Sequence, residues 1–345
     1  MKLRKKKAYS VAIMGATGAV GEEMLGILEQ RQFPVSKLVL LASARSVGKK
    51  YAYGGREIEV RELKEDSFEG IDIVLASAGG SISKRYAPLA VQAGAIVIDN
   101  TSAFRMDPEV PLVVPEINPK DIKKNNGIIA NPNCSTIIML VPLWPLHRAN
   151  KIKRVIVSTY QAASGAGAKA MQELEDQSRA VLAGQKAAPQ VFPHQIAFNL
   201  FSHNSAIKDE GYNEEELKMI KETYKIFHTD KIKVTATTVR VPVYRAHSEA
   251  IYVEFAKEPD LAEVRRILES APGVRIVDDR EKNYFPMPIE ASGKDDVLVG
   301  RIRRDPTSPK GLWLFVAGDQ LRKGAALNAV QIAEILCGRT VPVRV

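Results

Sequence analysis

The fold is decided by the stretch Gly15-Ala16-Thr17-Gly18-Ala19-Val20-Gly21, which joins a predicted strand over residues 8–14 to a predicted helix over residues 19–30. Its glycines follow the spacing Gly-x-x-Gly-x-x-Gly, a variant of the dinucleotide-binding fingerprint, in the strand-turn-helix context that this fingerprint requires. Glycines let the backbone approach a pyrophosphate closely, and the free N–H groups and dipole at the helix start stabilise its charge. An ordinary tight turn is the alternative, but the context favours a dinucleotide site. The predicted cofactor contacts are Gly15, Thr17, Gly18, Ala19 and Val20.

The end of the second predicted strand, over residues 37–42, distinguishes between the two nicotinamide cofactors. A NAD site usually has Asp or Glu there, to accept a hydrogen bond from the ribose 2′-hydroxyl. This chain instead reads Ser43-Ala44-Arg45-Ser46, followed by Lys49 and Lys50. Because hydroxyls and cations suit a 2′-phosphate, Ser43, Arg45 and Ser46 predict NADP(H) rather than NAD. The alternative is a basic loop that binds nothing.

The first half of the chain alternates short apolar runs with helical patterns, as repeated βα units do. Further strands are predicted over residues 71–76 and 96–99, with a helix over residues 82–93 between them. This alternation predicts an α/β domain whose Rossmann-type, mostly parallel sheet is covered on both faces. An amphipathic helix over residues 325–336 is expected to pack back onto this domain.

Beyond about residue 151 the pattern changes to β-branched strands interrupted by helices, which predicts a second α+β domain with a mostly antiparallel sheet. Strands are predicted over residues 154–160, 231–240, 250–255, 296–303 and 312–317, and helices over residues 168–182, 214–227 and 261–270. We therefore expect a nucleotide-binding domain over residues 1–150, completed by residues 323–345, and a second domain over residues 151–322.

The composition is that of a folded globular protein, with 45% hydrophobic and 26% charged residues among 345. No apolar run reaches the roughly 20 residues that span a bilayer, and no signal-peptide core follows the basic residues 2–7, so we expect a cytoplasmic protein without membrane partners. The 49 Lys and Arg against 40 Asp and Glu give a net charge of +9, which favours anionic partners. Since this excess forms no stripe with interleaved aromatics, no nucleic-acid partner is predicted.

Two cysteines, Cys134 and Cys337, imply no disulfide framework and fit a reducing compartment. Pro132 cannot continue a helix and Asn133 is the expected N-cap, so Cys134 falls in the first turn of a helix. Backbone N–H groups and the helix dipole there favour the thiolate, which makes Cys134 a candidate nucleophile. Cys337 has apolar neighbours in the last predicted helix, and we expect an inert core thiol.

The five histidines, at positions 147, 194, 203, 228 and 247, lack the short ligand spacing of a metal site, so no metal is predicted. His147 ends the helix that begins near Cys134, where the helix dipole would favour an imidazolium. His247 follows residues 240–246 in a strand-end loop that we expect to be exposed. From such a loop a neutral imidazole can relay a proton.

Eight segments, spread over nearly the whole chain and in the family's order, together resemble the aspartate-semialdehyde dehydrogenase family. They are residues 15–21, Thr101-Ser102-Ala103-Phe104-Arg105, residues 131–136, Gln161-Ala162-Ala163-Ser164-Gly165-Ala166-Gly167, residues 192–199, residues 215–219, Arg240-Val241-Pro242-Val243 and residues 322–326. Together they are far more specific than a single glycine loop. The resemblance implies NADPH-dependent reductive dephosphorylation of L-aspartyl 4-phosphate to L-aspartate 4-semialdehyde and phosphate, a step toward lysine (by way of diaminopimelate), methionine and threonine.

The resemblance also implies roles for particular residues. Cys134 matches the nucleophile that forms a thioester, His247 the acid/base, and Gln161 the residue that orients the histidine and the acyl intermediate. Arg105 and Lys218 match the phosphate-binding cations, Arg240 the partner of the substrate α-carboxylate and Glu215 the partner of its ammonium. Ser164, Gly165 and Asn328 join the cofactor contacts. Residues 151–322 become the catalytic and dimerisation domain of a homodimer or homotetramer.

Other interpretations stay open. The chain could instead be a related thioester-forming enzyme, such as N-acetyl-glutamyl-phosphate reductase or a malonyl-CoA reductase. The substrates of these enzymes have no free amine that Glu215 could bind. A non-catalytic NADP-binding or RNA-binding protein would need neither Cys134 nor His247. Taken singly, Glu215 and Lys218 also fit a solvated ion pair three residues apart on a helix.

Overall fold

A computed structural model of the chain describes residues 1–340. These residues form two compact units, Met1–Asn133 with residues 325–340, and Cys134–Gly324. The sequence predicts a division near residue 150, but α3 (Cys134–Ala149) packs on strands and helices of the second unit, so the units divide at its first residue. Residues 341–345 of the predicted C-terminal segment lie outside the described residues. Between residues 1 and 340, no helix is both long enough and apolar enough to span a bilayer.

A mostly parallel sheet lies at the centre of the first unit. Its strands are β1 (Tyr9–Met14), β2 (Val35–Ala42), β3 (Lys50–Tyr53), β4 (Arg56–Glu62), β5 (Ile73–Ala76), β6 (Ile96–Asp99) and β7 (Ile128–Ala130). They follow the order β3-β4-β2-β1-β5-β6-β7, and only β3 and β4 pair antiparallel. The predicted Rossmann-type sheet is confirmed. The β3–β4 hairpin was not predicted, although Gly54 and Gly55 between its strands are a hairpin signal.

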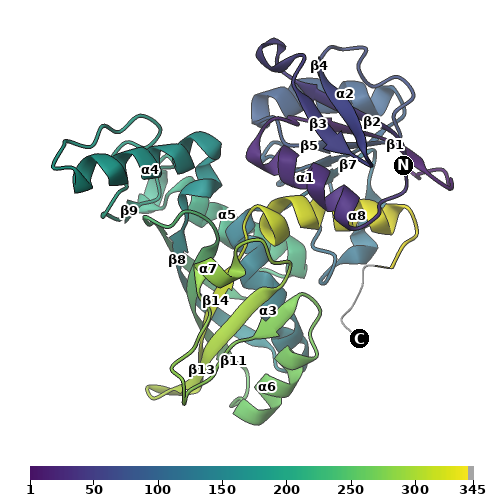
Figure 1. The fold of residues 1–345 in the computed structure, drawn as a ribbon. Coiled ribbons are helices and arrows are strands. Elements are labelled where there is room, and N and C mark those ends of the chain that lie inside the picture. The colour runs from purple at the N-terminus through teal and green to yellow at the C-terminus, as the bar shows by residue number, and fades with distance from the viewer. Residues whose placement is uncertain (341–345) are drawn as a thin grey trace. The chain divides into compact units, whose positions relative to one another are not determined.

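Helices cover both faces of this sheet (Figure 1). The core on one face joins α1 (Ala19–Gln30) and α8 (Leu327–Leu336) to Val11 and Ile13, and the core on the other joins α2 (Gly80–Gln92) to Ala12 and Met14. The expected amphipathic character of α8 is wrong, because residues 327–334 are all buried. Its packing onto the first unit is confirmed. Short 3-10 segments, η1 (Ala44–Ser46) and η2 (Pro119–Lys124), complete the unit.

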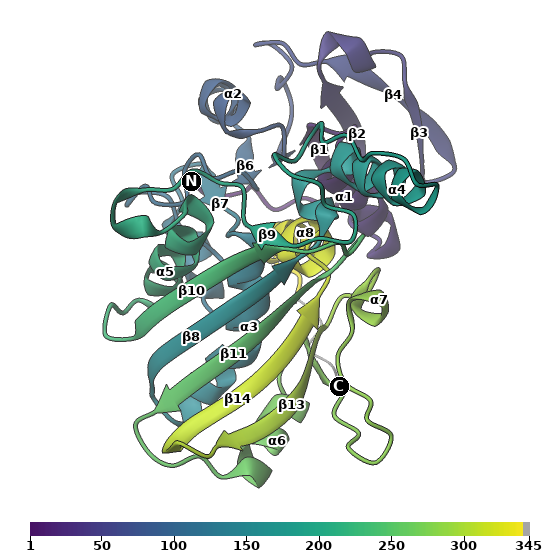
Figure 2. The same cartoon turned by 90° about the vertical axis from the view of Figure 1, so that its left-hand side faces the viewer.

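The second unit is built on a mostly antiparallel sheet, as predicted. Its strands are β8 (Ile152–Gln161), β9 (Phe201–Ser202), β10 (Lys233–Arg240), β11 (His247–Phe255), β12 (Val274–Ile276), β13 (Val297–Asp305) and β14 (Ser308–Gly318). They follow the order β12-β13-β14-β11-β8-β10-β9, with β8–β10 and β12–β13 as the parallel pairs. Figure 2 shows α3 behind this sheet. The other elements are α4 (Ala168–Leu182), α5 (Glu214–Phe227), α6 (Leu261–Glu269), α7 (Pro288–Ala291), η3 (Ala163–Ala166), η4 (Asp209–Gly211) and the π-helix η5 (Arg322–Ala326).

The strand register brings three candidate residues to one end of the second sheet. Gln161 and Arg240 are the last residues of the parallel strands β8 and β10 and are register partners. β11 runs antiparallel to β8 and begins at His247, one residue before the partner of Tyr160. Side chains on neighbouring strands at the same level face the same side of a sheet. Residues that lie 86 positions apart in the chain therefore become neighbours.

His147 at the end of α3 differs from the expected imidazolium. Its side chain is buried beside Trp144 and Phe227, and burial lowers its pKa to about 4. The neutral ring accepts a hydrogen bond from the backbone N–H of Ile152, with 3.2 Å between the nitrogens. The desolvation cost of a charged ring exceeds the favourable interaction with the helix dipole.

Glu249 of β11 is a buried carboxyl whose two oxygens have no hydrogen-bond partner among residues 1–340, and burial raises its pKa well above the usual 4.5. The folded chain therefore keeps a proton that the unfolded chain releases, so this group lowers stability as pH rises above 4.5. We expect Glu249→Met to raise the melting temperature. The difference in the free energy of unfolding between Glu249→Met and the parent should grow by about 1.4 kcal/mol per pH unit above pH 4.5, until the pH reaches the raised pKa of Glu249.

Thermal unfolding followed by circular dichroism at pH values of about 5, 6, 7 and 8 checks this expectation. Glu249→Gln is the control, because it removes the titration but still buries an amide. Its stability relative to the parent should show the same pH trend from a lower starting value. A difference between parent and Glu249→Met that stays constant with pH would contradict a protonated Glu249.

Candidate active site

The glycine loop of the first unit has the geometry of a phosphate-binding turn. Gly15 has a φ of 89°, and a Cβ there would lie 2.6 Å from the carbonyl oxygen of Ser77, so only glycine fits. Gly18 is the N-cap of α1 and no side chain caps this helix start. The N–H groups of the first turn, which includes Ala19 and Val20, are thus left for an anion rather than for a capping side chain.

The loop after β2 lies next to the glycine loop. β2 ends at Ala42 with no acidic residue, and the hydroxyls of Thr17 and Ser46 are 3.3 Å apart. Ser43 precedes η1 and Arg45 lies within it, both exposed. The hydroxyl and guanidinium groups predicted for a 2′-phosphate are therefore accessible beside the turn, and the donor set fits a dinucleotide.

Two other candidates in the first unit are held by internal hydrogen bonds. The Arg105 side chain is buried, and its Nε and Nη2 donate to the carbonyl oxygens of Asn131 and Asn100 at 2.9 and 3.0 Å. Asn328 is fully buried in α8, where its amide nitrogen donates to Val113 O at 2.9 Å and to Asn131 Oδ1 at 2.6 Å. The structure thus gives the Asn328 amide nitrogen a role in tying α8 to the strand connections.

Cys134 is the first residue of α3, as predicted, and is half-buried. The π-helix η5 passes close to it, because a Cβ on Gly324 would lie 2.8 Å from Cys134 Cβ. Gln320, just before this π-helix, would lie 3.3 Å from the same added Cβ. Its side chain accepts from the Ala246 N–H at 2.9 Å and donates to the Ser164 hydroxyl. Gln320 therefore connects the surroundings of Cys134 to the residues beside His247 and Gly165.

His247 is fully buried, not exposed as the sequence predicts. The backbone N–H of Ala162 donates to its Nδ1 at 3.0 Å, so the proton of the neutral ring is on Nε2, which has no partner within residues 1–340. Burial lowers the pKa of His247 to about 3, and the nearby Arg240 cation acts in the same direction. The ring is therefore a neutral donor with an unsatisfied Nε2–H, not an imidazolium.

Arg240 is oriented by the same residue as His247. Its Nη1 donates to the carbonyl oxygen of Ala162 at 2.9 Å, and its buried Nε has no partner among the described residues. Burial lowers the pKa of Arg240, while the charges of Glu215 and Cys134 act to raise it. A Cβ on Gly165 would lie 3.2 Å from both Arg240 Nη1 and His247 Nε2. The missing side chain at Gly165 thus leaves room at the unsatisfied donor of His247.

Glu215 lies in the first turn of α5 and is buried. Its Oε1 accepts from Gln161 Nε2 at 3.2 Å and its Oε2 from Lys218 Nζ at 3.1 Å. Gln161 Oε1 in turn accepts from the Thr159 hydroxyl at 3.2 Å. The Gln161 amide therefore orients Glu215, and the contact that orients His247 comes from the backbone of Ala162 instead.

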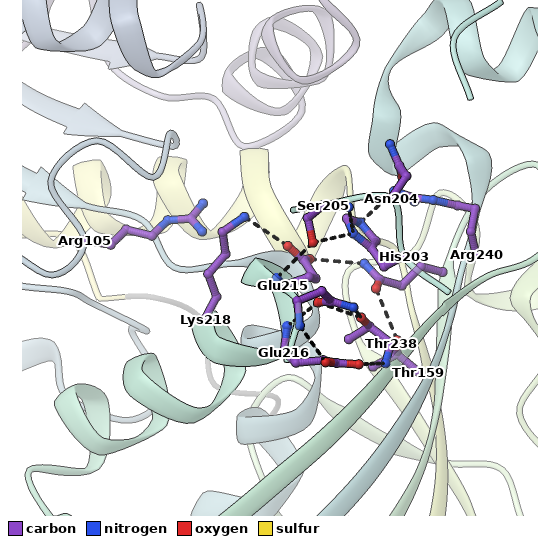
Figure 3. A network of polar contacts seen from close by, with 12 residues as sticks. Arg105, Thr159, His203, Asn204, Ser205, Glu215, Glu216, Lys218, Thr238 and Arg240 are labelled. Carbon is purple, nitrogen blue, oxygen red and sulfur yellow. Dashed lines mark hydrogen bonds and ion pairs between the residues drawn. The ribbon is translucent and has the colours of Figure 1, made fainter. Parts of the chain in front are cut away.

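A capping box fixes where α5 begins. The Asn213 side chain accepts from the Glu216 N–H, and the Glu216 carboxylate accepts from the Asn213 N–H, each at 2.9 Å. Glu216 also accepts from the Thr238 N–H at 3.0 Å, which ties the helix start to β10 (Figure 3). This local structure is what presents Glu215 and Lys218.

The second unit thus holds a thiol, an imidazole, a guanidinium and a carboxylate, here called the second-unit cluster: Cys134, His247, Arg240 and Glu215. Four polar neighbours of this cluster were not predicted as site residues: Thr159, His203, Ser205 and Gln320. Thr159 and Gln320 each lie two residues before a segment of the resemblance. The others carry no motif, and their places depend on strand pairing and loop contacts. No group of three or more His, Cys, Asp or Glu side chains between residues 1 and 340 is arranged to hold a metal ion.

The second-unit cluster combines groups with complementary chemistry. A thiol at a helix N-terminus is a nucleophile, and an unsatisfied imidazole N–H can stabilise a developing oxyanion. A buried guanidinium and a buried carboxylate suit the carboxylate and ammonium of an amino acid. The arrangement is therefore suited to acyl transfer from an amino-acid substrate.

Comparison with known proteins defines the class. The family model "Semialdehyde dehydrogenase, NAD binding domain" matches residues 10–125, and "Semialdehyde dehydrogenase, dimerisation domain" matches residues 143–323. Both parts of the chain therefore fall in the semialdehyde dehydrogenase class, and the first match supports a nicotinamide cofactor.

Individual relatives give a narrower assignment. The aspartate-semialdehyde dehydrogenase of Synechocystis sp. is 56% identical over 329 residues, covering 95% of this chain and 97% of that protein. Aspartate semialdehyde dehydrogenase II from Vibrio cholerae, in a crystal structure complexed with ASA, aligns with a TM-score of 0.94 and 47% identity, covering 97% of this chain and 100% of that one. The Candida albicans enzyme, crystallised with NADP, aligns with a TM-score of 0.73 and 27% identity, covering 95% and 98%. The chain belongs to the aspartate-semialdehyde dehydrogenase family.

Proposed function

We propose that the protein catalyses the NADPH-dependent reductive dephosphorylation of L-aspartyl 4-phosphate to L-aspartate 4-semialdehyde through a thioester on Cys134. The observation that carries the proposal is the second-unit cluster. There a helix-start thiol lies with a neutral imidazole donor, a buried guanidinium and a buried carboxylate. The first pair suits the reacting acyl group, and the second pair suits the α-carboxylate and α-ammonium of an amino acid.

In the first step the Cys134 thiolate attacks the acyl carbon of the substrate. A carbon–sulfur bond forms, the carbon–oxygen bond to the phosphoryl group breaks, and phosphate leaves with the bonding electrons. We assign Arg105 and Lys218 to the phosphate, because both are cations and phosphate is an anion with several acceptor oxygens. The thioester that remains accepts a hydride more readily than a carboxylate does.

His247 acts in both steps as a hydrogen-bond donor. Its Nε2–H is the donor available for the acyl oxygen as negative charge develops there, since Nδ1 is held by the Ala162 N–H. When the thioester carbon gains a hydride, the carbon–sulfur bond breaks, the aldehyde is released and the thiolate is restored. Gln161 supports the ammonium site by holding Glu215.

The nicotinamide cofactor supplies the hydride when it is bound. Gly15, Thr17, Gly18, Ala19 and Val20 would hold its pyrophosphate at the start of α1, and Ser43, Arg45 and Ser46 its 2′-phosphate. Ser164, Gly165 and Asn328 complete the proposed contacts. The absence of an acidic residue after Ala42 supports NADP over NAD.

The activity is tested by absorbance at about 340 nm with aspartate semialdehyde, phosphate and NADP. We expect turnover with this substrate and at least roughly a hundredfold lower kcat/KM with N-acetyl-glutamate semialdehyde, which lacks the free amine that Glu215 would bind. Nucleotide binding by folded protein without turnover of any semialdehyde would favour a non-catalytic binding protein.

Arg45→Ala is expected to lower kcat/KM for NADP by about tenfold and to leave kcat/KM for NAD within about twofold, because the guanidinium would lose a charge-assisted contact to the 2′-phosphate, which NAD lacks. Initial rates with both cofactors measure the ratio, with Lys37→Ala, an exposed β2 cation, as the control. Equal losses for both cofactors would remove Arg45 from the 2′-phosphate site.

The family match to a dimerisation domain supports an oligomer. We propose a homodimer or homotetramer formed through the second unit, with a product that feeds lysine, diaminopimelate, methionine and threonine synthesis. Its partners are then small anionic molecules rather than nucleic acid.

A further inference from the structure

His203 lies between two proposed substrate ligands and was not among the predicted site residues. Its Nε2 is 2.8 Å from Arg240 Nη2, and its Nδ1 is 3.1 Å from the Ser205 hydroxyl. That hydroxyl accepts from the backbone N–H of Glu215 at 3.2 Å (Figure 3). These hydrogen bonds form a path from Arg240 through His203 and Ser205 to Glu215. They link the proposed ligand of the substrate carboxylate to the start of the helix that carries the proposed ligand of the substrate ammonium.

The backbone holds His203 in this place. β9 pairs with the end of β10, where Phe201 is the register partner of Arg240. The His203 N–H continues the pairing by donating to Thr238 O at 2.9 Å. The imidazole is therefore anchored to the strand that ends at Arg240, and its position follows that strand.

The chemistry of the neighbours fixes the tautomer of His203. A guanidinium can only donate, so Nε2 must accept and the ring proton is on Nδ1, facing the Ser205 oxygen. The Ser205 backbone N–H also points at Nδ1, 3.2 Å away, and would need Nδ1 to accept; the shorter, charge-assisted contact to Arg240 outweighs it. Burial lowers the pKa of His203 to about 4, with Arg240 and Lys218 lowering it and Glu215 raising it. A neutral acceptor is what the contact to Arg240 needs.

Arg240 contacts its neighbours through its two terminal nitrogens, and its Nε–H remains for a ligand. Nη1 is taken by Ala162 O, and Nη2 by His203 Nε2, with Asn204 Oδ1 at 3.5 Å. The buried Nε has no partner among the described residues. Removing His203 would remove the shortest of these contacts and leave the planar guanidinium held mainly by Ala162 O, so the direction in which Nε–H points would be less firmly fixed.

We propose that His203, acting with Ser205, is a positioning residue that sets the spacing between Arg240 and Glu215 for the amino-acid end of the substrate. The inference rests on the proposed function, since it assumes that these two side chains bind the α-carboxylate and α-ammonium. His203 itself touches neither the acyl group nor the cofactor in this scheme.

Three substitutions distinguish the contact of His203 Nε2 with Arg240 from the contact of its Nδ1 with Ser205. His203→Leu removes both, His203→Gln can keep an acceptor near the Nε2 position, and His203→Asn can keep a donor near the Nδ1 position. We expect His203→Leu to raise the KM for aspartate semialdehyde by about tenfold, with the KM values for phosphate and NADP within about twofold. His203→Gln should recover most of the loss and His203→Asn little of it. His194→Leu is the matched control, because this exposed histidine packs against Phe201 of β9 but lies outside the hydrogen-bond path from Arg240 to Glu215.

A double-mutant cycle shows whether His203 acts through Arg240. If it does, the combined His203→Leu and Arg240→Lys variant should lose little more than Arg240→Lys alone, because the interaction that His203 supports is already gone. Melting temperature and NADP binding of each variant report folding. Should His203→Leu fail to fold, the comparison of His203→Gln with His203→Asn, together with Ser205→Ala, carries the same test.

The outcomes separate the two claims. No turnover of aspartate semialdehyde by the parent overturns the proposed function, and this inference with it. Turnover by the parent with an unchanged KM in the His203 variants overturns the inference alone. Equal changes in all three KM values, or strictly additive effects in the cycle, would mean that His203 supports the fold and does not set the substrate ligands.

Discussion

Cys134→Ser is expected to lower kcat by more than about a thousandfold while the affinity for NADP stays within a few-fold. A serine hydroxyl is far less acidic than a thiol and needs a base to become a nucleophile. His247 cannot supply that base in the observed arrangement, since Nδ1 already accepts from the Ala162 N–H and Nε2 carries the ring proton. The fall in kcat should therefore be larger than the lower reactivity of a hydroxyl alone would cause, because no base is available to deprotonate it.

Two measurements check this expectation. Initial rates from the absorbance of the reduced cofactor give kcat, and mass spectrometry of protein mixed with aspartyl phosphate in the absence of cofactor shows whether one aspartyl group is attached. The parent should carry the adduct on the peptide that contains Cys134, and the variant should carry none.

Cys337→Ala is the matched control. Burial raises the pKa of Cys337 to about 12, so its thiol is not a nucleophile at neutral pH. This variant should keep both activity and adduct. A Cys134→Ser enzyme that retains roughly a tenth of the parent rate would remove Cys134 from the mechanism.

Local patterns were enough to predict the class of fold and most of its longer helices and strands, although not short strands such as β7, β9 and β12. The glycine loop needs only its own strand and helix, and Cys134 needs only Pro132 before it and an apolar helix after it. Both features are short in sequence, so they could be predicted without knowledge of distant contacts. The alternation of apolar runs and helical patterns in the first half predicted the mostly parallel sheet, and the β-branched runs of the second half predicted the mostly antiparallel one.

What could not be predicted depends on burial and on long-range pairing. His247 was expected in an exposed loop, but the register of β11 against β8 places it inside. His147 was expected to be charged, and its burial keeps it neutral. His203 has no motif of its own and reaches Arg240 only because β9 pairs with β10. The spacing of apolar residues along α8 likewise could not show that residues 327–334 are all buried.

Arg240→Lys is expected to raise the KM for aspartate semialdehyde by about a hundredfold, with smaller changes in the KM values for phosphate and NADP. The guanidinium holds Ala162 O and His203 Nε2 with its two terminal nitrogens and still has Nε for a ligand. A single ammonium cannot reach these three directions at once. A lysine in this buried place would also tend to lose its proton, because burial already lowers the pKa of the arginine.

Arg179→Lys is the control, since Arg179 is exposed on α4 and paired with Glu175, and its kinetics should match those of the parent. The pattern of loss identifies the role of Arg240. A higher KM for aspartate semialdehyde at nearly constant kcat means that the guanidinium binds the α-carboxylate equally in the ground state and the transition state. A fall in kcat at constant KM would instead place Arg240 at the reacting acyl group, and the assignment of the carboxylate to this residue would be wrong. The same comparison made with a substrate analogue that lacks the carboxylate should show no difference between Arg240 and lysine, because the contact that distinguishes them is then absent.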